Sequence, residues 1–259
     1  MTGTTSLSAA VRAAGVAELV WRRADRSPGA LGVVPLLLGE LPAIALPWAQ
    51  VEAARAAAGG EATLVLSDPR LAGPGWEPLV ARGRLTLVED GDGSLFTEQL
   101  LDQELRKHPP SRALADSPML RREHWWYLPR LVLLLDPVDV VPGGRRDGPD
   151  DAVLAVDDGG LHVRTVRVPD WDTDPLEVTG APPGVRGPAV LVGQEVSVPD
   201  AERWTVHVTS GHCADGRLTG VRPAERRALE PVPGLRARVR RQRALERGCT
   251  QALRVAGHR

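Results

Sequence analysis

Apolar residues recur along most of the chain in short alternating or continuous runs, a pattern typical of β-strands. The first segment differs, because helical spacing of its apolar residues predicts a helix over residues 7–26. A Val-, Ile- and Leu-rich stretch over 31–48 then predicts two short strands about a turn at Gly39 and Glu40. The alanine-rich stretch 49–60, which ends in two glycines, predicts a helix.

The next segments predict a strand, a long strand, a helix and a further strand. The first strand covers residues 62–68, and the long strand covers 76–90 with Gly83 in mid-run, which is typical of a β-bulge. Residues 91–108 have the spacing of an amphipathic helix, which two prolines end. Residues 130–141 predict a buried strand that continues as an edge.

The pattern of strands begins again after a polar interruption. The Gly-, Pro- and charge-rich residues 142–151 predict a solvated linker. Residues 152–168 then predict a hairpin about an Asp-Gly-Gly turn, and 189–198 and 203–213 predict two further strands. From residue 224 onward, a proline-interrupted pair of basic helices is expected, docked on the β-rich body with its arginines in solvent.

The two strand-rich regions resemble each other. Seven residues separate Trp76 from Gly83, and seven also separate Trp204 from Gly211, with the sequences RLTLV and RLTGV following. Coincidence among glycine-punctuated strands is the alternative, but we interpret the spacing as an internal repeat of two β-units. The predicted organisation is a first unit with an N-terminal helix, a second unit and a basic helical tail, at residues 1–146, 147–223 and 224–259.

The order of the first elements resembles the pyridoxamine 5′-phosphate oxidase-like, FMN-binding split-barrel family. The residues that carry the resemblance are Arg82-Gly83-Arg84 through Val88-Glu89-Asp90 in the long strand, the following helix with ELRKHPP, and the next strand at 129–141. The resemblance covers residues 27–142 best, and residues 150–222 only through the repeat.

The resemblance implies a Greek-key barrel that dimerises, with flavin bound between two barrels. A tandem repeat could supply both halves from one chain. The expected fold class is therefore a β-rich α+β chain of two split-barrel-like (Greek-key) units that form an intramolecular pseudo-dimer with flanking helices. Members of the family include FMN-dependent oxidoreductases, heme-binding proteins and cofactor-free copies.

The segment that binds the phosphate in the family has few basic or hydroxyl side chains in this sequence. Residues 47–60 contain Arg55 as their only basic residue, no Ser or Thr, and Glu52 in the first helical turn. A phosphate requires hydrogen-bond donors and positive charge, so bound FMN would need donors from elsewhere in the chain.

An aromatic cluster at residues 121–130, RREHWWYLPR, is the densest group of candidate ligand contacts. Trp125 and Trp126 could stack on a flavin or porphyrin while Arg122 pairs with its anionic group, and His124 could act as acid, base or axial ligand. The structural alternative is a plug, in which one Trp fills the barrel and the other covers a helix.

Other candidate chemistry is weaker. His207 and His212 differ by an odd number of positions in one strand, so they should lie on opposite faces and make no metal site with Cys213. Two cysteines form neither a disulfide framework nor a four-ligand zinc site. With a net charge of −1, a dedicated nucleic-acid binder is not expected. Neither a signal peptide nor a membrane-spanning run is expected, which favours a soluble, cytoplasmic protein.

The resulting hypothesis is an FMN-binding split-barrel protein that acts as an oxidoreductase, with no catalytic residue assigned. A heme-binding split barrel, with His124 or a C-terminal His on the iron, and a cofactor-free scaffold stay open as alternatives. The expected partners are a small-molecule cofactor or substrate and, as a further alternative, a second copy in a homodimer, but neither nucleic acid nor a membrane. The predicted cofactor contacts are Trp48, Arg55, Arg82, Arg122, His124 and Trp125.

Overall fold

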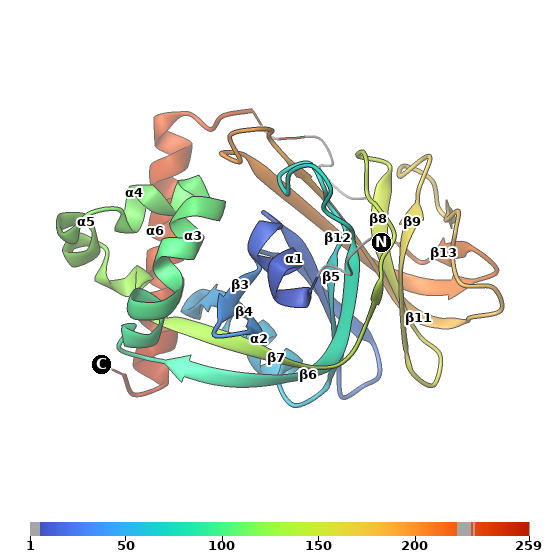
Figure 1. Cartoon of the computed structure of the whole chain (residues 1–259), viewed down its shortest axis with the longest axis horizontal. Coiled ribbons are helices and arrows are strands. Elements are labelled where there is room, and N and C mark those ends of the chain that lie inside the picture. The colour runs from blue at the N-terminus through green and yellow to red at the C-terminus, as the bar shows by residue number, and fades with distance from the viewer. Residues whose placement is uncertain (1–5, 222–228, 230, 259) are drawn as a thin grey trace.

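The computed structural model describes residues 6–221, 229 and 231–258. Over these residues the chain forms two antiparallel β-sheets of seven and six strands with six α-helices, a β-rich α+β arrangement. Helices α3 (Leu101–Lys107), α4 (Arg112–Ala115), α5 (Pro118–Glu123) and α6 (Leu235–Val255) gather at one end of the molecule, and the second sheet lies at the other (Figure 1). The first sheet lies between them.

The first sheet contains both features that the sequence predicts from glycines. Its strands are, in spatial order, β2 (Pro28–Val33), β1 (Ala17–Arg22), β5 (Glu61–Leu66), β6 (Leu79–Asp90), β7 (Arg130–Pro142), β4 (Leu41–Pro47) and β3 (Leu36–Leu38). The β3–β4 turn needs Gly39, whose φ is 61°. The register of β6 against β7 shifts between Arg82 and Gly83, which confirms the bulge. A Cβ on Gly83 would lie 2.0 Å from the Asp136 carbonyl oxygen, so only glycine fits.

The second sheet is built entirely from strands that follow residue 146. Its order is β10 (Leu176–Glu177), β13 (Arg217–Thr219), β12 (Trp204–Ala214), β11 (Gly187–Val196), β8 (Asp151–Asp157) and β9 (Leu161–Arg167). The hairpin predicted over 152–168 is confirmed by β8 and β9. Pairing of β11 with β12 is continuous through Gly211, so the bulge of β6 has no counterpart there. Strands β1 and β2 pack against β8, and β2 also contacts β11 and β12.

The helix predicted over residues 7–26 is wrong beyond its first two turns. Helix α1 (Leu7–Ala13) begins at the Ser6 cap, and residues 17–22 form β1 instead. Every residue of β1 before Arg22 is buried, because β1 is an inner strand between β2 and β5 and is covered on both faces. Apart from Glu18, the buried residues of β1 are apolar, as is typical of a strand covered on both faces, and here that apolar run coincided with helical spacing.

In the described part of the C-terminal tail, the long helix α6 forms one member of the predicted helix pair, the one that follows the prolines. Residues 224–228 and 230 lie outside the described residues. Cys249 and Leu253 of α6 are buried while its arginines face solvent, as predicted. Leu235 and Val239, near the start of α6, are 72% and 39% exposed.

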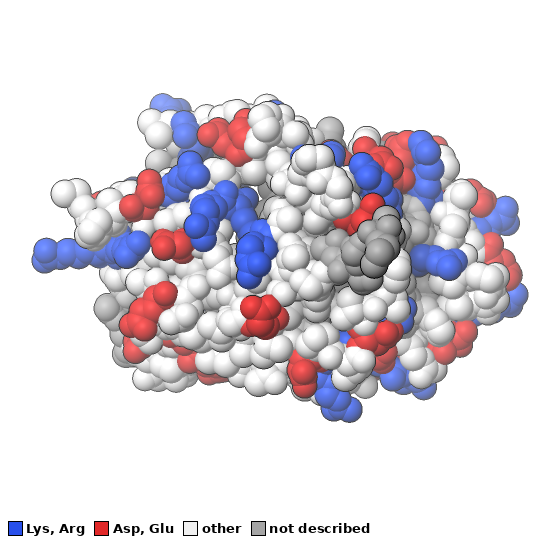
Figure 2. All heavy atoms as spheres, viewed as in Figure 1, with Lys and Arg blue, Asp and Glu red and all other residues white. Residues whose placement is uncertain are grey.

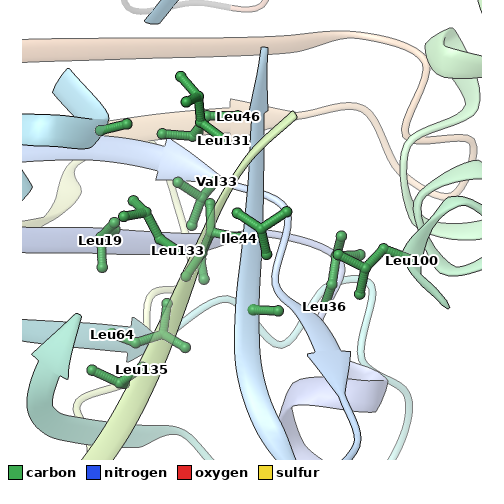
Figure 3. Packing of buried hydrophobic residues seen from close by; sticks show 14 of the residues in the cluster. Leu19, Val33, Leu36, Ile44, Leu46, Leu64, Leu100, Leu131, Leu133 and Leu135 are labelled. Atoms are coloured by element: carbon green, nitrogen blue, oxygen red, sulfur yellow. The ribbon is translucent and has the colours of Figure 1, made fainter. Parts of the chain in front are cut away.

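The core of the first sheet is filled by aliphatic side chains that converge from its strands and from the helical end (Figure 3). The residues labelled there are Leu19, Val33, Leu36, Ile44, Leu46, Leu64, Leu100, Leu131, Leu133 and Leu135. Helix α2 (Val51–Ala57) adds its buried alanines to the same core. Basic and acidic side chains are interspersed over the face in Figure 2. None of the helices in the described ranges is long and apolar enough to cross a membrane.

The segment predicted as a solvated linker contains a buried arginine, which corrects that interpretation. Arg146 is 1% exposed and joins the two sheets. Its guanidinium lies 2.9 Å from the Asp68 carboxylate and 3.3 Å from that of Glu18 in β1, and it donates to the Gln194 carbonyl oxygen in β11. Arg70 completes this inter-sheet cluster by bridging Asp68 and Glu195 at 2.7 and 2.8 Å.

Candidate functional site

A cavity of about 370 Å³ opens where the first sheet, the helical end, the second sheet and α6 meet. It is mostly apolar, with a small number of polar groups at its wall, which is the usual make-up of a small-molecule site. Its apolar lining residues include Val33, Ile44, Leu46, Leu114, Trp204 and Leu245. We call this cavity the inner pocket.

The polar wall of the inner pocket is a buried cluster around the Glu104 carboxylate. Glu104 Oε1 accepts hydrogen bonds from Ser111 Oγ at 2.7 Å and from the Tyr127 hydroxyl at 2.6 Å. The Arg130 guanidinium lies 3.5 Å from the same oxygen. All four residues are at most 7% exposed. We call them the pocket cluster.

Local sequence explains how these residues meet. Helix α3 ends at Lys107 because Pro109 and Pro110 cannot continue it, and the short turn η3 (Pro109–Ser111) brings Ser111 back onto Glu104. A second short turn, η4 (Trp125–Tyr127), directs Tyr127 inward immediately before β7 begins at Arg130.

Arg130 is held between two aromatic rings. Its guanidinium carbon lies 3.8 Å from the Tyr127 ring centroid and 4.3 Å from that of Phe96, and the group donates to the Tyr127 carbonyl oxygen. Its Nε has no hydrogen-bond partner among the described residues. A buried cation with an unsatisfied donor beside a cavity is suited to an incoming acceptor.

Burial sets the protonation of Tyr127. Desolvation, followed by the charge of Glu104, raises the pKa of the Tyr127 hydroxyl well above its usual value. The hydroxyl is therefore protonated at neutral pH and acts as a hydrogen-bond donor to Glu104.

His108 stands where the inner pocket meets a second cavity. Its Nδ1 is 3.0 Å from Ser111 Oγ, and its ring meets the Trp204 ring edge-on at 5.8 Å. Burial lowers the pKa of His108, which the charge of Glu104 only partly offsets, so the imidazole is neutral near pH 7. Because Nδ1 is engaged, Nε2 is the ring nitrogen left for a ligand.

The second cavity, which we call the outer chamber, has a volume of about 530 Å³ and shares His108 and Trp204 with the inner pocket. Its lining includes Arg203, which precedes β12, and Arg238 in the first turn of α6. Neither guanidinium forms an ion pair with a carboxylate in the part of the chain that the structure describes. The outer chamber therefore offers positive charge next to an apolar inner pocket.

The structure places the first three residues of the predicted site apart from these cavities. Trp48 is fully buried in η1 (Trp48–Gln50) and packs against the His258 ring at 5.0 Å. Arg55 is paired with Glu89 at 2.8 Å, and Arg82 with Asp139 at 3.0 Å. The charge of each arginine is thus already matched by a carboxylate.

The other three predicted residues lie on α5 and η4. Arg122 is exposed on α5, and Trp125 is partly buried against the first core. His124 contacts Gln242 of α6 through Nε2 at 3.0 Å, while its Nδ1 is buried and has no hydrogen-bond partner among the described residues. Within RREHWWYLPR the buried side chains include Trp126, Tyr127 and Arg130; Trp126 packs into the first core, and Tyr127 and Arg130 line the inner pocket.

Sequence reasoning missed Glu104, His108 and Ser111, although they lie within eight positions of one another. The available signal was a polar Glu, His and Ser set around two prolines at a helix end. That signal is also typical of a solvated turn, and only burial distinguishes the two.

No metal centre is found where the structure describes the chain, which holds no group of three or more His, Cys, Asp or Glu side chains in ligating positions. As predicted, His207 and His212 face opposite ways on β12, with His207 buried and His212 exposed.

Comparison with known proteins adds two likenesses in fold. No family model and no curated protein matches this chain. A pyridoxamine 5′-phosphate oxidase-related, FMN-binding protein from Nostoc punctiforme superposes with a TM-score of 0.30 and 14% identity over 77% of this chain and 86% of that one. A heme-binding protein from Mycobacterium smegmatis gives 0.35 and 13% over 96% and 100%. Because both TM-scores are below 0.5, we infer function from this chain's own side chains.

Proposed function

We propose that this chain binds a planar cofactor with an anionic end, and that FMN is that cofactor. The observation that carries the proposal is a pair of neighbouring cavities that share His108 and Trp204 in their walls: an apolar inner pocket with buried hydrogen-bonding groups, and an outer chamber lined by Arg203 and Arg238. A flavin ring requires apolar walls and a few donors or acceptors at its edge, and its phosphate requires positive charge.

The residues present fit such a group. Val33, Ile44 and Leu46 would face the ring, and the Arg130 Nε is a buried donor without a partner. Arg203 and Arg238 would hold the phosphate, in the role that Arg55 is too closely tied to Glu89 to play. A bound flavin would supply hydride and electron transfer, so an oxidoreductase activity is part of this proposal.

The chain's own side chains would bind and orient the ring. Tyr127 and Ser111 hold the Glu104 carboxylate, and Arg130 balances its charge, so the polar wall keeps one arrangement. His108, neutral and oriented by Ser111, could accept or hold a proton at Nε2.

The paired-unit architecture belongs to the same proposal. Gly83 in β6 and Gly211 in β12 each follow a tryptophan by seven residues, and each leaves no room for a Cβ. The nearest atoms would be the Asp136 carbonyl oxygen at 2.0 Å and the Thr219 carbonyl oxygen at 2.3 Å. These shared constraints support two split-barrel-like units packed as a pseudo-dimer, although Gly211 lacks the bulge.

The test is a titration of the purified chain with FMN and with riboflavin, which lacks the phosphate. We expect FMN to bind more tightly, and Arg203→Ala with Arg238→Ala to weaken FMN about tenfold while leaving riboflavin unchanged. Arg164→Ala, which removes one exposed arginine from β9, is the matched control. Absence of FMN binding by the unchanged chain would overturn the proposal and favour the cofactor-free scaffold.

Heme is the second candidate, and the observation that favours it is the neutral His108 imidazole in the wall shared by the two cavities, with Nδ1 engaged by Ser111 and no hydrogen bond from Nε2 to a described residue. An imidazole oriented by a second hydrogen bond is a usual iron ligand. Titration with hemin would then give a Soret shift that His108→Gln abolishes and His124→Gln does not.

A further inference from the structure

Trp204 reaches the candidate site from the second sheet. It begins β12, yet its indole lines both the inner pocket and the outer chamber and contacts His108 edge-on. The orientation of this ring therefore affects the shape of both cavities.

The indole of Trp204 is hydrogen-bonded to Gln194. Trp204 Nε1 donates to Gln194 Oε1 at 2.9 Å, and Gln194 Nε2 donates to Glu18 Oε1 at 2.6 Å. Gln194 is 1% exposed, so water does not substitute for either partner. An indole nitrogen can only donate, so the amide oxygen of Gln194 faces the indole and its nitrogen faces Glu18, which leaves the amide a single workable orientation.

Glu18 is itself anchored in the inter-sheet cluster. Its Oε2 accepts from Ser67 Oγ at 3.0 Å, and Arg146 Nε lies 3.3 Å from its Oε1. Ser67 and Gln194 donate to this carboxylate, and Arg146 adds its positive charge beside it, while burial raises the pKa of Glu18. A continuous chain of contacts thus leads from Arg146 through Glu18 and Gln194 to the indole of Trp204.

Strand β2 packs against the Gln194 amide and the Trp204 indole through Gly32. A Cβ on Gly32 would lie 3.0 Å from Gln194 Oε1, 3.0 Å from Trp204 Cζ2 and 2.6 Å from Val206 Cγ2. Gly32 has no positive φ, so glycine is required there for space alone. The amide and the indole are therefore clamped between β2 and the second sheet.

We propose that Gln194 is a positioning residue. Its amide links the inter-sheet cluster to Trp204 and so fixes the orientation of the indole, and that orientation sets the affinity of the inner pocket for its planar ligand. We call the effect on ligand affinity the affinity half of this proposal, and the orientation of Trp204 by Gln194 the positioning half. The affinity half rests on the proposed function, and the positioning half does not. Two substitutions separate positioning from stability. Gln194→Glu keeps an acceptor for the indole but places a second carboxylate beside Glu18, and Gln194→Met removes both hydrogen bonds.

The first measurement uses the ligand-free protein. In a ¹⁵N–¹H spectrum the Trp204 indole signal, assigned by its loss in Trp204→Phe, should shift and exchange faster with solvent in Gln194→Met. In Gln194→Glu it should stay close to its original position. An unchanged indole signal in Gln194→Met would overturn the positioning role, whether or not FMN binds.

The second measurement compares FMN affinity with melting temperature. At about pH 8, two facing carboxylates make Gln194→Glu the less stable variant, and its melting temperature should recover toward about pH 6 as one carboxylate takes up a proton. We nevertheless expect Gln194→Glu to bind FMN within about twofold of the unchanged chain, and Gln194→Met to bind about three- to tenfold more weakly.

This opposite order of stability and affinity is the result that a merely structural role would not give. Trp204→Phe should weaken FMN as Gln194→Met does, and the double variant should lose nothing further. Gly32→Ala should weaken FMN as well, because its methyl group displaces the indole. If affinity follows stability across these variants, the affinity half is overturned. If the unchanged chain binds no FMN, the affinity half falls with the proposed function, and the indole spectrum alone decides the positioning half.

Discussion

Two buried clusters in this protein each combine glutamate with arginine, and they differ in what surrounds them. The inter-sheet cluster places Arg146 between Glu18 and Asp68, all at most 2% exposed, in contact with both sheets. The pocket cluster places Arg130 beside Glu104, with hydroxyl groups completing the carboxylate's partners and a cavity alongside.

The two clusters differ in whether a buried polar group is left available to a ligand. In the inter-sheet cluster Arg146 joins Glu18 and Asp68. Its loss leaves Glu18 without a paired cation among the described residues and leaves Asp68 with Arg70 alone. In the pocket cluster two hydroxyls already satisfy Glu104, and Arg130 keeps a donor without a partner. The first arrangement joins two halves of the fold, and the second leaves a polar group available to a ligand.

The largest effect is expected from Arg146→Met. Removing one member of a buried ionic cluster leaves uncompensated charge, so the free energy of unfolding should fall by about 3–5 kcal/mol in urea denaturation. Arg186→Met is the control, because Arg186 pairs with Asp215 on the surface with side chains 62% and 65% exposed, and it should change stability by less than about 1 kcal/mol. Equal losses in the two variants would contradict the role given to the inter-sheet cluster.

Arg130→Met should have a smaller effect on stability and a larger one on binding. Glu104 keeps its two hydroxyl donors, so we expect a loss of about 1.5–3 kcal/mol, the range for one hydrogen bond to a charged group. Binding of FMN should weaken about tenfold or more in the same titration. Arg146→Met, measured at a temperature where it stays folded, should show the reverse balance, with stability lost and less change in affinity.

Lys107 extends the comparison, because it is a half-buried cation without a carboxylate partner among the described residues. Its Nζ donates to the carbonyl oxygens of Val11 and Pro35, and burial lowers the pKa of Lys107 to about 7. The unfolded chain therefore binds more protons above that pH, and stability should rise with pH, by about 1 kcal/mol from about pH 7 to about pH 8.5.

Urea denaturation across that pH range would measure this dependence. Lys107→Met should flatten it, because the titrating group is removed. The same slope in both proteins would assign the pH dependence to other groups. This pH range ends below the ordinary pKa of a cysteine thiol, and burial raises the pKa values of the thiols of Cys213 and Cys249.

The smallest effect is expected from Arg82→Ala. Arg82 and Asp139 form an exposed pair, with side chains 38% and 47% accessible, so stability should change by less than about 1 kcal/mol. We also expect FMN affinity to stay within about twofold. A clear loss of FMN binding would instead support the contact that the sequence predicts for Arg82.

Much of the fold could be predicted from local sequence. Gly39 and Gly83 marked a turn and a bulge because only glycine fits a left-handed φ or a backbone approach as close as that of Asp136. The two prolines after residue 108 marked a helix end for an equally local reason. Strand β1 was mistaken for helix because its burial depends on β2 and β5, which local spacing does not reveal.

The candidate site was predicted less well. The sequence directed attention to the aromatic cluster, and two of its residues, Tyr127 and Arg130, do line the inner pocket. The residues chosen as contacts were those with conspicuous chemistry, but Arg55 and Arg82 are paired with carboxylates from distant strands. Their partners, Glu89 and Asp139, lie 34 and 57 residues further along the chain.

The sequence alone determined the alternation of strands and helices, the two strand-rich regions and the positions where glycine or proline is required, since each depends on backbone geometry within a few residues. Only the tertiary structure decided which polar residues are buried and with what partners. Arg146, in a segment that reads as linker, became the link between two sheets, and Trp204, from the second sheet, became a wall of the pocket. Burial and charge pairing depend on residues far apart in the chain, and these interactions set the chemistry of the site.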